Sequence, residues 1–228
     1  MKSEPRVRHE DGFPGPLSHG DMFAGLPYLL LVGGSSCAGK TTLCAALSEQ
    51  YGIRRFSIDD HLGEYALKGR ENGLPVCLHQ DLLSPEEFWM RDPVELCEEL
   101  IGFYREIFPF VMEDLRSTAK EGPLIAEGIA LMPELVMKEF PNLTEMAPPQ
   151  LPELTGTVSS QHVEYICMVA EESFQVRHYR EREWVPLLLD GCRDKKKAFS
   201  NWMKREKLFA EYIKQTAEQS GCRVYMIQ

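Results

Sequence analysis

An eight-residue loop motif constrains this chain more than any other feature. Residues 34–41 read Gly-Ser-Ser-Cys-Ala-Gly-Lys-Thr and fit the pattern G-x-x-x-x-G-K-[ST] without a mismatch. The apolar run 28–32 precedes the motif and predicts a strand buried on both faces, and apolar residues at helical spacing follow it as far as Gly52. A strand, a glycine-rich loop and a helix in this order predict a loop that wraps a phosphate with main-chain N–H groups.

Each residue type in this loop has a chemical reason to be there. Gly34 and Gly39 let the main chain approach a phosphate, while the ammonium group of Lys40 would reach the β- and γ-phosphates. The hydroxyl group of Thr41 would contact Mg²⁺. We therefore expect ATP and Mg²⁺ as cofactors. The expected nucleotide-binding residues are Gly34, Ser35, Ser36, Cys37, Ala38, Gly39, Lys40, Thr41 and Thr42. The Cys37 thiol is either redox-sensitive or a tolerated variable side chain that points away.

The other apolar segments predict a three-layer α/β fold with a five-stranded parallel sheet. Residues 28–58 form a strand, a helix and a second strand, and such a unit places its two strands parallel. Further strands are expected at 123–126, 163–169 and 223–227.

Helices are expected at 85–118, 133–140, 172–185 and 198–219. The first of them carries a capping box of Ser84 and Glu87, and Pro93 and Pro109 should bend or divide it. Three segments are predicted to lack regular structure: a flexible tail at 1–25, and irregular stretches at 61–83 and 141–161.

Composition limits the kinds of ligand and location. The net charge of −10 argues against general affinity for nucleic acid, which depends on lysine and arginine contacts with phosphates. No apolar run approaches the roughly 20 residues that cross a bilayer, so no membrane span is expected. Seven cysteines without C-x-x-C spacing favour reduced thiols in the cytoplasm over a disulfide framework or a zinc site. Since nucleic acid and a membrane are both disfavoured as partners, a small-molecule partner is expected. The oligomeric state stays open.

Acidic residues follow two predicted strands at the edge where open parallel sheets bind ligands. Asp59 and Asp60 follow the second strand, and Glu127 follows the third, just before Gly128. A carboxylate in the first position can orient a substrate hydroxyl group and accept its proton during phosphoryl transfer. Asp59 is favoured as this base over Asp60, and either could instead cap a helix or form a turn. Glu127 could hold Mg²⁺, bind a substrate hydroxyl group or be an ordinary strand-end residue.

A basic segment interrupts the acidic chain. Residues 177–207 hold ten Lys and Arg residues against five Asp and Glu residues, a local charge of +5 that leaves −15 elsewhere. Arg177 and Arg180 are three residues apart and share a helix face, whereas Arg182 points elsewhere. The pair could stabilise the charge that grows on a transferring phosphoryl group. The alternative is a solvated helix face on which arginines pair with neighbouring glutamates.

Together these segments resemble P-loop small-molecule kinases of the uridine kinase and nicotinamide riboside kinase type, in the nucleoside-monophosphate-kinase-like group. The resemblance rests on the loop at 34–41, the Asp59-Asp60 and Glu127-Gly128 pairs, and the arginines after the fourth strand. It implies one kinase-like domain at 26–228, with a helical acceptor-site insertion at 61–118 and a basic lid at 172–207. It does not imply which acceptor is used, nor the choice between ATP and GTP.

The sequence thus predicts an enzyme that moves the γ-phosphoryl group of ATP to a hydroxyl group of a small nucleoside-, sugar- or vitamin-like metabolite. The catalytic residues would be Lys40, Asp59, Arg177 and Arg180; the substrate-binding residues Asp59, Asp60 and Glu127; and the metal ligands Thr41 and Glu127. An alternative is a nucleotide-sensing protein with slow hydrolysis and no small-molecule acceptor. A weaker hypothesis, a kinase of nucleic-acid ends or sugar nucleotides, is disfavoured by the overall acidity.

Overall fold

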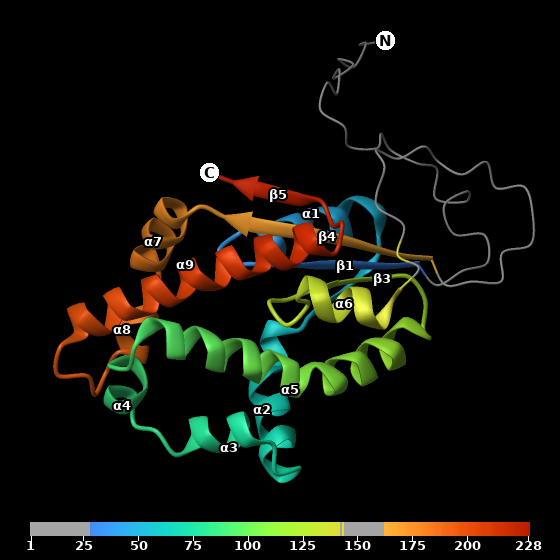
Figure 1. The fold of residues 1–228 in the computed structure, drawn as a ribbon. Helices are drawn as coiled ribbons and strands as arrows, with labels where there is room; N and C mark the ends of the chain where they lie inside the picture. The colour runs from blue at the N-terminus through green and yellow to red at the C-terminus, as the bar shows by residue number, and fades with distance from the viewer. Residues whose placement is uncertain (1–27, 142, 144–161) are drawn as a thin grey trace, which may run out of the picture.

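A parallel sheet forms the centre of the structure, a computed structural model that describes residues 28–141, 143 and 162–228. Within them, five strands lie in the order β2-β3-β1-β4-β5. They are β1 (Tyr28–Gly34), β2 (Arg54–Ser57), β3 (Leu124–Glu127), β4 (His162–Ala170) and β5 (Val224–Ile227). Every pairing is parallel, as predicted, so the carboxyl ends of all strands meet at one edge, on the left in Figure 1.

Helices cover both faces of this sheet, which confirms the three-layer α/β fold. Successive residues of β1 point to opposite faces, as the pleat of a strand requires. Leu30 and Val32 belong to the apolar cluster under α1 (Lys40–Tyr51). Leu29 and Leu31 belong to the larger cluster under α5 (Pro93–Ala119) and α9 (Lys195–Gln219). Figure 1 accordingly shows α1 behind the sheet and α5 and α9 in front of it.

The remaining helices are short. They are η1, a 3₁₀ turn (Asp59–His61), α2 (Leu62–Glu71), α3 (Pro75–Asp81), α4 (Pro85–Trp89), α6 (Pro133–Glu139), α7 (Glu172–Glu181) and α8 (Val185–Leu188). The helices η1 to α5 all lie between β2 and β3 in the chain. Within the described ranges, no helix combines the length and the apolar character needed to cross a bilayer. The predicted tail at 1–25 and nearly all of the predicted irregular stretch at 141–161 lie outside the described residues.

The prediction that residues 61–83 are irregular is wrong, because α2 and α3 occupy most of this stretch. Its glycines led to that prediction, but Gly69 has a packing role inside α2. A Cβ atom at this position would lie 2.4 Å from the Sγ atom of Cys77 on α3. Tyr65 of α2 is fully buried, and its hydroxyl group donates to Asp114 of α5. Burial against neighbouring helices therefore outweighs the low helix propensity of glycine.

The helix predicted at 85–118 is in fact two helices, and the second of them begins at Pro93. The predicted capping box is present: the Ser84 hydroxyl group accepts from the Glu87 amide, and the Glu87 carboxylate accepts from the Ser84 amide. α4 ends at Trp89, and α5 then begins at Pro93 with Asp92 as its N-cap. Pro109 does not divide the helix, because α5 continues through it. The helix predicted at 172–185 likewise ends early, at Glu181, and this changes where Arg182 points.

Candidate active site

The loop between β1 and α1 has the backbone geometry of an anion-binding turn. Gly34, Cys37 and Gly39 have φ values of 122°, 59° and 78°, so three residues lie in the region that favours glycine. Helix α1 begins immediately afterwards at Lys40, and no side chain caps its first turn. The N–H groups at a helix start need acceptors, and the helix dipole favours negative charge there. This end of α1 is therefore suited to phosphate oxygens.

Gly34 brings the loop into contact with the neighbouring strand. A Cβ atom on Gly34 would lie 1.8 Å from the carbonyl oxygen of Met168 in β4. The next amide, of Ser35, donates to the same carbonyl oxygen at 2.9 Å. The loop and the end of β4 are thus packed without room for any side chain at Gly34.

This packing predicts a large loss of stability in a Gly34→Ala variant. Gly122 is the matched control, because its φ of 131° is similar to the 122° of Gly34 but nothing lies within 4 Å of its added Cβ atom. We expect Gly122→Ala to cost about 1–2 kcal/mol of unfolding free energy from strain alone. Gly34→Ala should cost more than about 4 kcal/mol, since the backbone must also shift. Denaturant unfolding without nucleotide measures both, and equal losses would contradict this account.

Lys40 is a buried cation held inside the loop. The residue is 5% exposed, and its Nζ atom donates to the carbonyl oxygen of Ser35 at 2.7 Å. The positive charge of Lys40 favours the ionised forms of both Asp59 and Glu127. The structure therefore brings Lys40 and the two predicted carboxylates into one electrostatic environment.

Thr41 and Glu127 form a direct contact between the loop and β3. The Thr41 hydroxyl group donates to Oε1 of Glu127 at 3.1 Å. The second carboxylate oxygen, Oε2, is buried and has no hydrogen-bond partner among the described residues. Burial, together with the nearby negative charge of Asp59, raises the pKa of Glu127, while Thr41, Lys40 and the side chain of Ser57 oppose the rise. A buried and unsatisfied carboxylate oxygen is costly unless a ligand completes its contacts.

Asp59 lies where β2 ends and is held by the chain after β3. Its Oδ1 atom accepts from the Ile129 amide at 3.0 Å. Gly128 makes this approach possible, because a Cβ atom there would lie 2.6 Å from Cβ of Ile58 and 3.1 Å from Oδ1 of Asp59. Burial raises the pKa of the Asp59 carboxyl group, and the charge of Lys40 opposes this rise. Asp60, by contrast, is exposed.

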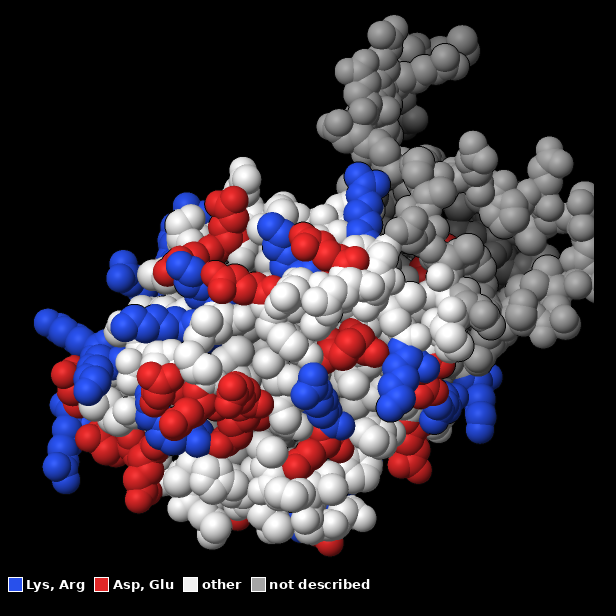
Figure 2. Space-filling model, viewed as in Figure 1, with Lys and Arg blue, Asp and Glu red and all other residues white. Residues whose placement is uncertain are grey.

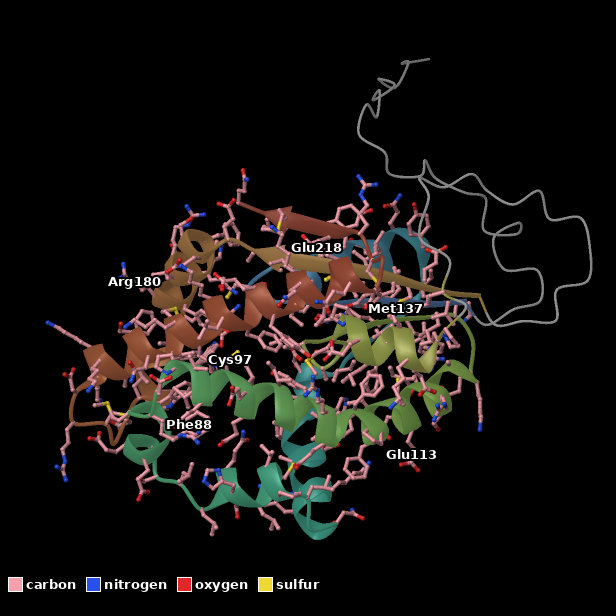
Figure 3. All side chains as sticks on the ribbon, viewed as in Figure 1. Phe88, Cys97, Glu113, Met137, Arg180 and Glu218 are labelled. Carbon is pink, nitrogen blue, oxygen red and sulfur yellow. The ribbon has the colours of Figure 1, made fainter. Side chains whose placement is uncertain are left out.

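The structure places Arg177 and Arg180 on the outer face of α7. Both line an open hollow with Glu171, Glu172 and Glu181, and the described contacts do not join either of them to the loop. Figure 3 labels Arg180 at the outer edge of α7, away from the strands. Figure 2 shows positive and negative side chains interspersed at this end of the molecule. In this conformation both side chains are exposed on a mixed-charge surface, and each lies over an aromatic ring, Arg177 over Phe174 and Arg180 over Phe199.

The charge of Arg182 influences Cys37 of the loop, which the sequence prediction missed. Burial raises the pKa of the Cys37 thiol, and the positive charge of Arg182 opposes the rise. The prediction assumed that the helix continues through Arg182. Instead, α7 ends at Glu181, and Arg182 has an extended backbone with φ −84° and ψ 122°. A raised pKa keeps the Cys37 thiol protonated at neutral pH, which disfavours a redox role.

A second buried group next to the loop was also missed. Cys37 packs against an apolar cluster that includes Trp89, Tyr179 and Trp202. Within it, Arg205 and Glu206 form a buried ion pair, and the guanidinium carbon of Arg205 lies 4.9 Å from the centroid of the Trp89 ring. The sequence of a charged helix such as α9 does not show which of its ion pairs are buried, because burial depends on the elements that pack against the helix.

The strand order and the loop define a three-layer α/β P-loop fold. No protein-family model and no curated protein matches the chain. An uncharacterized protein from Eubacterium ventriosum is 15% identical, with a TM-score of 0.35 and coverage of 88% of this chain and 89% of that one.

Two further solved structures have named activities. Deoxyadenosine kinase from M. mycoides with bound dATP is 14% identical, with a TM-score of 0.39 and coverage of 86% and 89%. A tRNA delta(2)-isopentenylpyrophosphate transferase from Staphylococcus epidermidis is 11% identical, with a TM-score of 0.37 and coverage of 88% and 93%. At these values the likeness carries no argument about activity, so the function must be argued from the site.

Proposed function

We propose that this chain is an ATP-dependent phosphotransferase that moves the γ-phosphoryl group to a hydroxyl group of a small metabolite, like the P-loop small-molecule kinases it resembles. The observation that carries the proposal is the meeting of the loop, the Thr41–Glu127 contact and Asp59 at one edge of the sheet. A protein that only holds a nucleotide needs the loop. It has no need of a second, largely buried carboxylate fixed beside Lys40.

The loop and Lys40 bind and orient the phosphates. The uncapped first turn of α1 offers N–H donors to the phosphate oxygens. Lys40 now donates to the Ser35 carbonyl oxygen, and in a complex its ammonium group would turn to the β- and γ-phosphates. Because Lys40 is 5% exposed, its charge is little screened by water and acts strongly on the transferring group.

The residues present fit Mg²⁺. Magnesium prefers oxygen ligands, and Glu127 offers one oxygen already on the Thr41 hydroxyl group and a second that is buried and unpartnered in the described structure. Among the described residues no three Asp, Glu, His or Cys side chains converge, so phosphate oxygens and water would complete the coordination. When bound, the ion would neutralise the charge that develops on the phosphates.

Asp59 is the proposed base. Its Oδ1 atom is occupied by the Ile129 amide, which leaves Oδ2 to accept the proton of the acceptor hydroxyl group. The acceptor oxygen bonds to the γ-phosphorus as the bond from that phosphorus to the bridging oxygen breaks, and ADP leaves. Burial raises the pKa of Asp59, which makes it a stronger base than an exposed aspartate.

Two regions would enclose the acceptor, as the resemblance implies: the insertion at 61–118 and the basic lid at 172–207. Trp89 of the insertion and Trp202 of the lid region lie 4.8 Å apart between ring centroids, so the two regions already touch. We propose that Arg177, Arg180 or Arg182 reaches the phosphates when nucleotide and acceptor are bound.

A coupled assay for ADP release tests the proposal. The chain is incubated with Mg²⁺ and ATP, and with a panel of nucleosides, sugars, vitamins and amino alcohols. We expect one chemical class to raise turnover from slow hydrolysis into the roughly 1–100 s⁻¹ range of kinases. GTP in place of ATP gives the base preference. Tight nucleotide binding with equal rates across the whole panel would contradict the proposal and favour a nucleotide sensor.

A further inference from the structure

Helix α7 is joined to the phosphate-binding loop by a buried amide side chain. Gln175 is 1% exposed, and its Nε2 atom donates to the main-chain carbonyl oxygen of Ser36 at 3.0 Å. Gln175 and Tyr179 are the buried residues of α7, and at a spacing of four they share one helix face. This face, rather than the outer face of Arg177 and Arg180, is the one that contacts the loop.

The contact determines the direction of one loop N–H group. A peptide unit is planar and trans, so its carbonyl oxygen and its N–H group point in opposite directions. The Ser36 carbonyl oxygen belongs to the same peptide as the Cys37 N–H group. Since the oxygen points at Gln175, the Cys37 N–H group points away from α7.

Other contacts hold the preceding part of the loop. At the Ser36 carbonyl oxygen, Gln175 is the nearer of two donors, at 3.0 Å against 3.4 Å for the Ser35 hydroxyl group. The Ser35 amide donates to Met168 at 2.9 Å, and the Ser35 hydroxyl group accepts from the Ala170 amide at 2.9 Å. Both contacts come from the end of β4. Cys37 itself has a φ of 59°, which is unfavourable for any residue but glycine and persists only where surrounding contacts enforce it.

We propose that Gln175 is a positioning residue that turns the Cys37 N–H group toward the bound phosphates, so that the docking of α7 and nucleotide affinity depend on each other. The inference rests on the proposed nucleotide binding but not on any acceptor. The same face of α7 also contacts α9, because the Tyr179 hydroxyl group donates to Oε2 of Glu206 at 3.4 Å. Glu206 also accepts from Nε1 of Trp202 at 3.1 Å, so α7, α9 and the loop form one connected unit.

Asn201 provides a matched control for a purely structural role. It is also a buried amide, 7% exposed, and its Nδ2 atom donates to two main-chain carbonyl oxygens, that of Trp89 at 3.0 Å and that of Arg91 at 3.2 Å. The Gln175→Met and Asn201→Leu variants each remove the donor with little change in size. Gln175→Met removes the shorter of the two hydrogen bonds to the Ser36 carbonyl oxygen, whereas Asn201→Leu removes this donor from two carbonyl oxygens. Asn201→Leu should therefore lower thermal stability at least as much as Gln175→Met.

Titration of Mg²⁺ and ADP into the full-length variants tests the inference. We expect Gln175→Met to weaken ADP binding about tenfold, the usual effect of one hydrogen bond, and Asn201→Leu to change it less than about twofold. Gln175→Glu should weaken it further, because an ionised carboxylate cannot donate and repels phosphate. Equal affinities for Gln175→Met and wild type, or equal losses for Gln175→Met and Asn201→Leu, would overturn the positioning role. Wild-type protein that binds no ADP would overturn the proposed function as well.

Hydrogen exchange of the wild-type chain gives a second measurement that needs no variant. Exchange at the Cys37 amide should slow at least tenfold when Mg²⁺ and ADP are added at saturation, because the N–H group becomes bonded to phosphate. Slowing at the α1 amides with none at Cys37 would overturn the inference.

Discussion

An Asp59→Asn variant should lose phosphoryl transfer by a factor of about 10²–10⁴ and keep nucleotide affinity, because it removes the proposed base alone. Asparagine retains an oxygen that can accept from the Ile129 amide, the contact that Asp59 makes at 3.0 Å. The loop and Lys40 are unchanged, so the fold and the phosphate contacts should persist. Initial rates of ADP release with the identified acceptor, and titration with ADP, measure the two properties separately.

The pH profile provides an independent check on Asp59. The base acts in its ionised form, and burial raises its pKa above the ordinary range of aspartate. In the wild type, kcat/KM should therefore begin to fall on acidification at a higher pH than an exposed aspartate would give. The residual activity of Asp59→Asn should not show this fall in kcat/KM on acidification. Should Asp60→Asn lose the transfer and Asp59→Asn keep it, the assignment of the base is contradicted.

A Glu127→Gln variant should change activity and stability in opposite directions. It removes the carboxylate proposed for Mg²⁺, so turnover should fall about 10²-fold or more and need more Mg²⁺ to reach its maximum. In the absence of ligand, the variant should be more stable at neutral pH. Glu127 is 1% exposed, and its Oε2 atom is buried without a described partner, so its ionised form is costly in the folded state.

The sign of this stability effect follows from the direction of the pKa shift. Burial and the charge of Asp59 raise the pKa of Glu127 in the folded protein. A raised pKa means that stability is greatest below the unfolded-state pKa and is lost as the pH rises through the folded-state pKa. We expect thermal melts of the nucleotide-free variant to show a gain of about 2–4 °C at neutral pH, the effect of about 1 kcal/mol in a chain of this size. The gain should vanish below the ordinary pKa of glutamate.

Glu121→Gln is the control for this effect. Its side chain is 71% exposed and pairs with Arg54 on the surface, so the substitution should leave both activity and melting temperature nearly unchanged. A Glu127→Gln variant that is less stable than the wild type at neutral pH would show that its carboxylate is satisfied in the folded state.

The parts of the site that sequence reasoning located are those in which a local pattern carries the chemistry. Gly34, Lys40 and Thr41 all belong to one eight-residue motif. Glu127 is the last residue of β3 and Asp59 comes two residues after β2, and parallel strands bring their ends to the same edge. Their meeting therefore follows from strand direction, which the strand-helix-strand pattern predicts.

The parts that were missed depend on neighbours that are distant in the chain. Helix α2 forms because Gly69 packs against Cys77 and Tyr65 is buried, although its glycines suggest a loop. The charge of Arg182 favours the ionised form of the Cys37 thiol, and α7 ends at Glu181, four residues before the predicted helix end at 185. A glutamine such as Gln175 gives no signal in a sequence, since its buried contact with Ser36 spans 139 positions.

By itself, the sequence determined the parallel α/β class, the glycine-rich loop between the first strand and the first helix, and the carboxylates at the strand ends, because short-range spacing encodes each of them. Only the tertiary structure decided which arginine acts on the loop, which carboxylate oxygen is left unpartnered and which helix face holds the Ser36–Cys37 peptide. Those properties depend on burial and on hydrogen bonds between distant segments, which no local pattern in the sequence encodes.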